Sequence, residues 1–322
     1  MNTSQLNPFR ETEFLEKYRK KKPSGTAFLQ YIDNLHRQGG PDPGDYNTIN
    51  EVLNHYISKL TPEQTIRLHK RLAKVFGPDY VESTAGHATI KPYGYPGDYE
   101  IMDRMYLYKH SERPEFAKWD RFYHWQAAAK CIINRKTYFK TEVKKKLADA
   151  RARGEDLHVM NIACGPGRDV FELFNEESQE GLYFDFVDAD LNAILHATRL
   201  NAKYLSHIRF HNCSIFRLKA EKKVDFLWSG GLFDYFDDET FVSMMAKVHH
   251  YVRPGGEMII GNVSPFNPTR GYMELFVGWF IHHRSEQELI DMAKAACGDR
   301  LERVWVGEEP EGVNLFVHVQ LK

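Results

Sequence analysis

The stretch from His158 to Phe171 constrains the fold of this chain more than any other feature. An apolar run, residues 158–162, leads into the small-residue segment Ala163–Gly167, and an amphipathic segment follows. This order is typical of a β-strand, a tight loop and the start of a helix. Glycine lets a ligand approach the backbone closely, and the N–H groups at a helix start bind acidic or phosphate groups. The stretch therefore predicts a ligand site where a strand ends.

A second apolar run, residues 182–188, ends in the carboxylate of Asp188. A carboxylate at the end of the second strand of a parallel sheet can accept both hydroxyls of a ribose. The two runs together predict a site for an adenosine-type cofactor. A dinucleotide loop needs a third glycine, in the order Gly-x-Gly-x-x-Gly, and Val170 occupies that place. This argues against a nicotinamide-dependent oxidoreductase.

Strand and helix patterns alternate from about residue 156 onwards, which indicates a parallel sheet. The last two strands are close enough for an antiparallel hairpin across a Gly/Pro turn. The fold class expected is therefore α/β, a parallel sheet with a C-terminal antiparallel hairpin. The predicted strands cover residues 158–162, 183–188, 208–212, 224–228, 257–263, 301–306 and 313–320, and the predicted helices residues 169–175, 193–204, 239–251 and 285–296.

The first 150 residues show helical spacing, beginning with Phe14, Tyr18, Phe28, Tyr31, Ile32 and Leu35. Further helices are expected over residues 47–60 and 62–76, and over 114–150 as one long helix or a bent pair. Residues 90–100 carry two prolines, two glycines and three tyrosines, a composition that suits a pocket wall or lid. We therefore expect a helical lid domain over residues 1–150 and a cofactor-binding domain over 151–322.

Composition excludes several classes of function. The net charge of −1 gives no basic face for nucleic acid, and no apolar run is long enough for a membrane span. The N-terminus lacks the apolar core of a signal peptide. The four cysteines are widely spread without a Cys-x-x-Cys pair, which suggests reduced thiols in a cytoplasmic protein. A small molecule is the expected partner, with neither nucleic acid nor membrane, and a homodimer is left open.

Three segments resemble class I S-adenosylmethionine (SAM) methyltransferases. Residues 161–167 are similar to motif I of that family, residues 188–193 to the segment after it, and residues 253–256 to the Pro-Gly-Gly turn before strand five. The resemblance implies a Rossmann-like sheet and SAM as cofactor. A hydroxyl at Ser214 replaces the acidic residue that many members place near the adenine. The cofactor-binding residues that we expect are Ala163, Cys164, Gly165, Gly167, Asp188, Ala189, Ser214, Ile215, Ser229 and Arg135.

Methyl transfer from a sulfonium needs alignment, exclusion of water and, for some acceptors, removal of a proton. No metal is required, and the adjacent pairs His249-His250 and His282-His283 do not suggest one. Residues 229–236 follow strand four, where class I enzymes place groups near the methyl. They lack the Asn/Asp-Pro-Pro-aromatic motif of enzymes that methylate nucleobase amino groups. A small-molecule acceptor is therefore expected.

A closer resemblance covers roughly residues 90–322. Residues 91–100, 231–235 and 261–274, with 133–136 as a weaker match, are similar to a bacterial group that includes proteins of 3-hydroxypalmitic acid methyl ester biosynthesis. The resemblance implies O-methylation of a carboxylic acid, such as a 3-hydroxy fatty acid. Nearby carboxylates keep a second acceptor open, a free amino acid or guanidino group such as that of arginine. A non-catalytic binding protein on the same fold is the third hypothesis.

The segments around strands four and five, together with residues 90–100, supply the candidate acceptor site. Arginines would orient a carboxylate, whereas acidic groups would hold a cation and remove its proton. The catalytic candidates are Tyr93, Asp98, Asp234, Tyr235 and Glu274, and the substrate-binding candidates are Tyr95, Phe233, Asn262, Arg270, Trp279 and Arg284.

Overall fold

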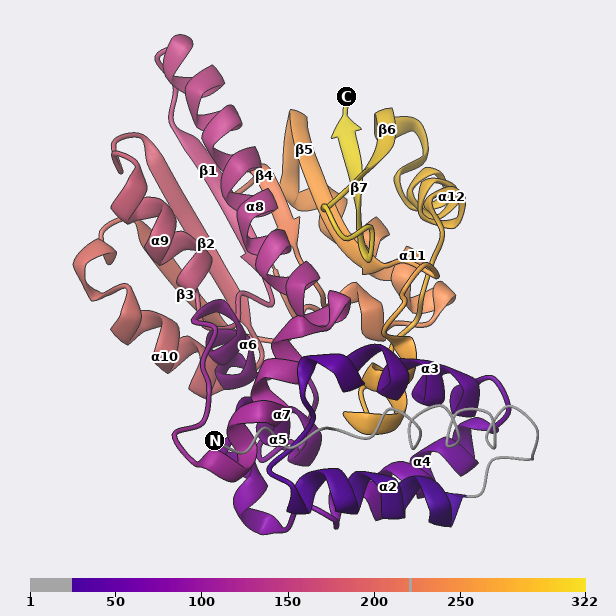
Figure 1. Ribbon diagram of the computed structural model, residues 1–322. Helices are drawn as coiled ribbons and strands as arrows, with labels where there is room; N and C mark the ends of the chain where they lie inside the picture. The colour runs from indigo at the N-terminus through magenta and orange to yellow at the C-terminus, as the bar shows by residue number, and fades with distance from the viewer. Residues whose placement is uncertain (1–24, 220–221) are drawn as a thin grey trace. The chain divides into compact units, whose positions relative to one another are not determined.

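The structure is a computed structural model that describes residues 25–219 and 222–322. The predicted helical positions Phe14 and Tyr18 lie outside these residues. The described chain forms two units (Figure 1). The helical unit comprises the described residues up to Gly94, then His110–Gln126 and Pro268–Trp279. The sheet unit comprises Tyr95–Lys109, Ala127–Asn267 and Phe280–Lys322.

The sheet unit contains a seven-stranded sheet in the order β3-β2-β1-β4-β5-β7-β6. The strands from β3 to β5 pair in parallel, whereas β7 is antiparallel to both β5 and β6. This confirms the predicted Rossmann-like sheet with its C-terminal hairpin. The strands are β1 (Leu157–Ile162), β2 (Leu182–Asp188), β3 (Ile208–Asn212), β4 (Val224–Ser229), β5 (Val252–Val263), β6 (Leu301–Glu308) and β7 (Asn314–Leu321).

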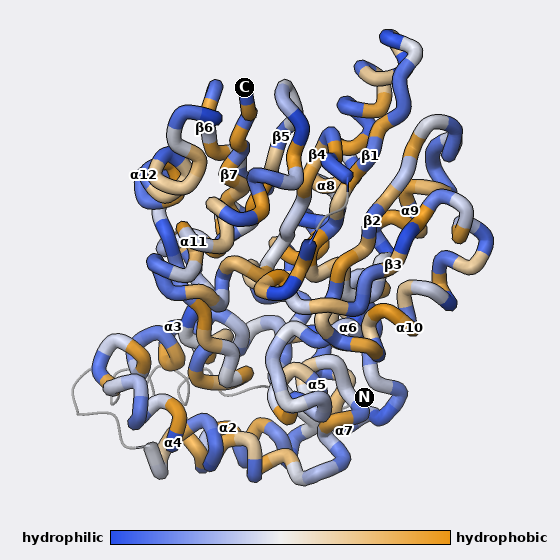
Figure 2. The backbone as a smooth tube through the Cα atoms, turned by 180° about the vertical axis from the view of Figure 1, so that it is seen from behind, coloured by the Kyte–Doolittle hydropathy of each residue, from blue (hydrophilic) through white to orange (hydrophobic). Residues whose placement is uncertain are grey.

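Helices cover both faces of this sheet because its strands point apolar side chains alternately to either side. On β1, Val159 packs with α8, α9 and α10, whereas Met160 packs with α11 and α12. Figure 2 shows the strands as a largely hydrophobic layer. The helices of this unit are α6 (Tyr99–Tyr106), α8 (Ala127–Ala152), α9 (Arg168–Glu176), α10 (Leu191–Leu200), α11 (Asp238–Val248) and α12 (Glu286–Cys297), with the short turns η3 (Ala202–Tyr204), η4 (Phe233–Tyr235), η5 (His249–Tyr251) and η7 (Gly298–Arg300).

The helical unit is held by an aromatic core in which Trp119, for example, lies between Phe76 and Phe276. Helix α4 begins with a capping box, in which the Thr61 hydroxyl accepts from the Gln64 N–H and the Gln64 side chain accepts from the Thr61 N–H. The elements are α2 (Gly25–Arg37), η1 (Pro43–Asp45), α3 (Tyr46–Ile57), α4 (Pro62–Ala73), η2 (Pro78–Glu82), α5 (Thr84–Ile90), α7 (Pro114–Trp125) and the π-helix η6 (Tyr272–Phe276).

The division between units differs from the predicted boundary at residue 150. The predicted helix 114–150 is a pair, α7 and α8, broken at Gln126, whose backbone is extended. Helix α8 buries Phe139, Val143 and Leu147 against the sheet, which places it in the sheet unit. Residues 268–279 instead join the helical unit, where the Asn54 side chain bonds to Pro268 and Gly271. Within the described ranges, no helix combines the length and apolar character of a membrane span.

Candidate functional site

The loop after β1 has an unusual backbone. Ala163, Gly165 and Gly167 all have φ between +55° and +65°. A Cβ atom at position 165 would meet no protein atom within 4 Å, so space is open in front of Gly165. A Cβ at position 167 would lie 2.6 Å from the Phe186 ring. Gly165 therefore leaves room for a ligand, whereas Gly167 allows the start of α9 to approach the sheet.

The Asp188 carboxylate lies beside this loop, at the carboxyl end of β2. Its two oxygens accept hydrogen bonds from the N–H groups of Gly165 and Asp190, both at 2.9 Å. Burial raises the pKa of Asp188, and these two N–H bonds act against the rise. Each carboxylate oxygen has a second lone pair, so Asp188 keeps the capacity to accept two ligand hydroxyls.

The end of β4 holds a buried hydroxyl and a buried cation. The Ser229 hydroxyl oxygen is fully buried and has no hydrogen-bond partner among the described residues. The Arg135 guanidinium donates to the Gly230 carbonyl at 3.1 Å and contacts the Met102 sulfur at 3.6 Å. No carboxylate in residues 25–219 or 222–322 lies within ion-pair distance of it. Because buried charges are normally paired, this arginine is suited to an anionic group of a ligand.

Asp234 follows β4 in η4 and is almost fully buried. One of its carboxylate oxygens accepts from the Val263 N–H at 2.8 Å. Burial raises the pKa of Asp234 to about 7, although Arg135 and Arg284 both favour its ionised form. A carboxylate with this pKa can take up or release a proton near neutral pH.

Arg284 lies in the interior, and all of its guanidinium nitrogens donate hydrogen bonds to protein atoms. Their acceptors are the Asp238 carboxylate, the Asn262 side-chain oxygen and the carbonyl oxygens of Phe233 and Phe236. The Asn262 amide donates in turn to Val263 and His282. Arg284 and Asn262, two predicted substrate contacts, thus belong to a network that holds η4 against β5.

Phe233, a further predicted substrate contact, lies in the core. It is fully buried and packs edge-on against Phe236 and Phe241 in the core beneath α11. Asp98 is buried too, and its carboxylate caps α6 by accepting from the N–H groups of Glu100 and Ile101. Phe233 and Asp98 therefore both make structural contacts.

Tyr95 and Tyr235 lie at the surface of the sheet unit, each a little over a third exposed. Their hydroxyls bond to Asp190 and to the Pro96 carbonyl, respectively. Four other predicted residues line the sheet edge without a distinctive contact. They are the buried Cys164, the exposed Ala189, the buried Ile215 and Ser214, whose hydroxyl accepts from the Phe216 N–H.

The remaining predicted residues belong to the helical unit. Arg270 and Glu274 form an ion pair at 2.6 Å, one turn apart. Tyr93 is partly exposed near the His87 ring, and Trp279 is partly buried at the end of the segment 268–279. The structure thus gathers the cofactor candidates in one unit and divides the acceptor candidates between the two units.

Asp169 was missed by the motif analysis. It stands in the first turn of α9, is buried, and its carboxylate lies 3.4 Å from the Asn161 amide. Burial raises the pKa of Asp169 to about 6. Tyr106 is partly buried and interacts with the charges of both Arg135 and Asp169. The position of Asp169 shortly after the glycine loop is the sequence feature that could have identified this residue.

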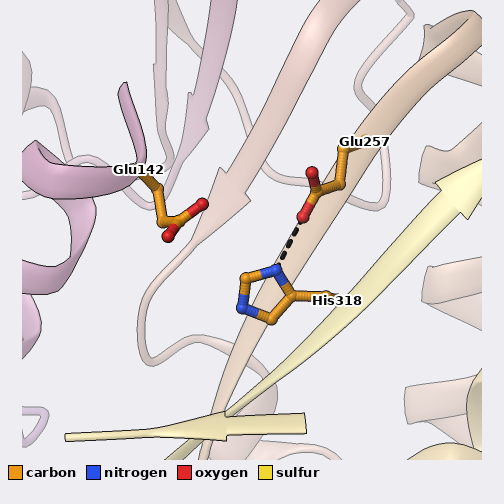
Figure 3. Close-up of side chains that lie close together, drawn as sticks. All are labelled: Glu142, Glu257 and His318. Carbon is orange, nitrogen blue, oxygen red and sulfur yellow. Dashed lines mark hydrogen bonds and ion pairs between the residues drawn. The ribbon is translucent and has the colours of Figure 1, made fainter. Parts of the chain in front are cut away.

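A separate cluster of possible metal ligands joins α8, β5 and β7. Ligand atoms of Glu142, Glu257 and His318 lie within 4.8 Å of one another (Figure 3). The His318 ring bonds to Glu257 at 2.6 Å through one nitrogen and to the Tyr138 hydroxyl at 2.7 Å through the other. Lys146 forms an ion pair with Glu257. Since protein partners occupy the imidazole and Lys146 supplies a positive charge, the cluster is a structural network.

Comparison with known proteins places these features in a family context. Residues 159–256 match the model of a methyltransferase domain. This range contains the glycine loop, Asp188 and Asp234. None of the curated proteins compared matches the sequence significantly.

One solved structure shares the fold over nearly the whole chain, and two others show a weaker similarity. A possible exported protein from Bordetella parapertussis is 16% identical, with a TM-score of 0.61 over 93% of this chain and 97% of its own. The 1,6-didemethyltoxoflavin-N1-methyltransferase of Burkholderia thailandensis is 19% identical, with a TM-score of 0.42 over 54% and 76% of the two chains. The N-methyltransferase NodS of Bradyrhizobium japonicum is 16% identical, with a TM-score of 0.40 over 57% and 87%.

Proposed function

We propose that this SAM-dependent methyltransferase methylates a nitrogen atom of a small molecule, an amino or guanidino group, with Asp234 as the proton acceptor. The observation that carries the proposal is the buried Asp234 carboxyl, whose pKa is raised to about 7 by burial. A nitrogen acceptor must lose a proton during transfer, whereas a carboxylate acceptor is already ionised at neutral pH.

Several groups of the sheet unit have hydrogen-bonding capacity or charge with which they would bind the cofactor. Asp188 would accept from the ribose hydroxyls, and the space in front of Gly165 would admit the cofactor. Arg135 would bind the carboxylate of the methionine part, and Asp169 its ammonium group. The unpartnered Ser229 hydroxyl offers one more hydrogen bond. When bound, SAM supplies a methyl group activated by the sulfonium charge.

The contacts that Arg270 and Arg284 already make within the protein favour a nitrogen acceptor over a carboxylate acceptor. Arg284 donates to protein acceptors in the interior, and Arg270 is neutralised by Glu274. A carboxylate substrate would have to displace one of these contacts. An ammonium or guanidinium substrate would instead meet the ionisable Asp234.

O-methylation of a carboxylic acid, such as a 3-hydroxy fatty acid, is the second candidate. It is supported by the Arg270 side chain, which is 46% exposed. The Glu274 side chain is only 13% exposed, so a substrate acid would have to offset the loss of the Arg270–Glu274 contact. In this case the variant Arg270→Gln would lose activity and Asp234→Asn would not.

The acceptor can be identified with the full chain and labelled SAM. We would assay amino acids, including arginine, beside 3-hydroxy fatty acids, and treat each product with mild alkali. An ester releases methanol, whereas an N-methyl group persists, so the proposal expects an alkali-stable product. Asp234→Asn should lower kcat by about 100-fold or more, the usual contribution of a general base. Asp149→Asn, which changes an exposed carboxylate of α8, is the matched control.

An alkali-labile product, formed equally well by Asp234→Asn, would overturn the nitrogen acceptor and favour the ester. Binding of SAM and S-adenosylhomocysteine, measured by isothermal titration calorimetry, is independent of the acceptor. The proposal also includes a cytoplasmic enzyme without nucleic-acid or membrane partners, which cell fractionation tests. Analytical ultracentrifugation would decide whether the enzyme is a homodimer.

A further inference from the structure

One chain of polar contacts in the sheet unit begins and ends on helix α8. The Tyr138 hydroxyl bonds to the His318 ring of β7 at 2.7 Å. The other ring nitrogen bonds to Glu257 of β5 at 2.6 Å (Figure 3). The second carboxylate oxygen of Glu257 pairs with Lys146, which lies eight residues after Tyr138 on α8. Since an α-helix rises about 1.5 Å per residue, the two attachments are about 12 Å apart along α8.

The interior of this chain is buried and closely packed. His318 is 2% exposed, and its ring stacks on Trp305 with 4.7 Å between centroids. Tyr138 stacks on Phe316 at 4.1 Å, and Gly307 makes room for its hydroxyl, since a Cβ at position 307 would lie 2.2 Å from that oxygen. Apolar side chains alone would also pack after a shift of one helical turn, about 5.4 Å. Buried polar groups favour a single register, because a shift would leave them without partners.

The same face of α8 carries Arg135, whose position is narrowly limited. Residues 135, 138, 142 and 146 follow at intervals of three or four, so their side chains share one side of the helix. Arg135 lies against the loop after β4, where a Cβ at Gly231 would be 2.5 Å from its guanidinium and a Cβ at Gly230 would be 3.2 Å from its Cδ. A displacement of α8 would therefore press Arg135 into this backbone or break its bond to the Gly230 carbonyl.

We propose that the chain Tyr138–His318–Glu257–Lys146 is a clamp that sets the register of α8 and so places Arg135 for the cofactor carboxylate. Tyr138 and Lys146 are positioning residues, because they act on the cofactor through the backbone of α8 and Arg135. The proposal rests on the proposed function for the role of Arg135. It gives a part in cofactor binding to a buried polar network that the transfer chemistry does not use.

The double variant Tyr138→Phe/Lys146→Met releases both ends of the clamp and leaves the strands unchanged. Phenylalanine keeps the stacking on Phe316, and methionine keeps an aliphatic side chain. The matched control is Tyr204→Phe/Lys145→Met, which removes a hydroxyl on η3 and an exposed ammonium group on α8. Isothermal titration calorimetry on the full chain compares S-adenosylhomocysteine with methylthioadenosine, which lacks the amino-acid end of the cofactor.

A displaced Arg135 loses its bond to the cofactor carboxylate, whereas the adenosine contacts remain. The affinity of the double variant for S-adenosylhomocysteine should therefore fall about five-fold or more, and its affinity for methylthioadenosine should stay within about two-fold of the wild type. In the Arg135→Met background the two substitutions should have no further effect, because they act through a group that is already absent. The control should match the wild type with both ligands.

Unchanged affinity for S-adenosylhomocysteine in the double variant, beside a weakened Arg135→Met, would overturn the clamp alone. An equal loss for both ligands, or a further loss in the Arg135→Met background, would also overturn it, because α8 would then support the site as a whole. If Arg135→Met bound S-adenosylhomocysteine like the wild type, the role of Arg135 in the proposed function would be wrong, and the clamp proposal would fall with it. Tyr138→Phe alone is measured against the same expectations if the double variant loses its circular dichroism spectrum.

Discussion

The buried Asp234 carboxyl makes the stability of the protein depend on pH, and Asp234→Asn should remove that dependence. In the folded state its pKa is about 7, whereas the ordinary value is 3.8. Between these two values the folded state keeps a proton that the unfolded state has released. Because the unfolded state binds fewer protons, the free energy of unfolding falls as pH rises through this window. Asparagine retains an acceptor for the Val263 N–H but does not titrate.

The size of the effect follows from the separation of the two pKa values. A difference of one in pKa corresponds to about 1.4 kcal/mol in the free energy of unfolding, so the full difference between the two pKa values corresponds to about 4 kcal/mol. From about pH 5 to about pH 8, the linkage relation gives a loss of roughly 2–3 kcal/mol from this group alone. The stability of Asp234→Asn relative to the wild type should rise by that amount. Asp149→Asn, at an exposed carboxylate, should show no such rise.

Urea unfolding followed by tryptophan fluorescence at several pH values would measure this difference. The midpoint should shift with pH while the denaturant slope stays the same, as for a pure change in stability. A constant difference between Asp234→Asn and the wild type at every pH would refute the reasoning. It would show that Asp234 titrates in its ordinary range, and it would also remove the physical basis for a proton acceptor at this position.

The glycine loop and Asp188 give the remaining predictions. Asp188→Ala should weaken SAM binding by about ten-fold or more in calorimetry, because a hydrogen bond to a charged group is lost, and near-normal affinity would exclude it from the site. Gly165→Val should abolish SAM binding with an unchanged circular dichroism spectrum, and normal binding would contradict the assignment of the loop. Gly167→Val should lower the melting temperature, because its Cβ would lie 2.6 Å from Phe186, and wild-type melting would disprove that packing role.

Sequence predicted the sheet well because its signals are local. The predicted strand 208–212 coincides with β3, and the apolar runs before Ala163 and up to Asp188 are β1 and β2. The predicted helix 285–296 is present as α12, with Ser285 as its N-cap and Ser285 and Glu288 bonded to each other within one turn. Such contacts involve residues that are near in the chain, so their chemistry can be recognised without a tertiary structure.

The division into units depended on contacts between residues far apart in the chain. Residues 268–271 are held by Asn54, more than 200 positions earlier. Helix α8 follows α7 after a single extended residue, yet it buries its apolar side chains on the sheet. Neither hydrophobic spacing nor turn residues indicate which surface a helix will meet. A boundary drawn where helices give way to strands therefore falls at residue 150, inside the sheet unit.

The acceptor was the hardest part to predict, because its chemistry depends on which charges are already paired. In the sequence, Arg135, Arg270 and Arg284 are equivalent cations near candidate site segments. In the structure, Arg284 donates to interior acceptors, Arg270 pairs with Glu274, and Arg135 is buried without a carboxylate partner. A buried cation with no carboxylate at ion-pair distance is costly, so of these three arginines Arg135 has the strongest need for an anionic ligand. If Arg135 binds the cofactor carboxylate, no equally unpaired arginine is left for a substrate acid, and Asp234 is the charge that selects the acceptor.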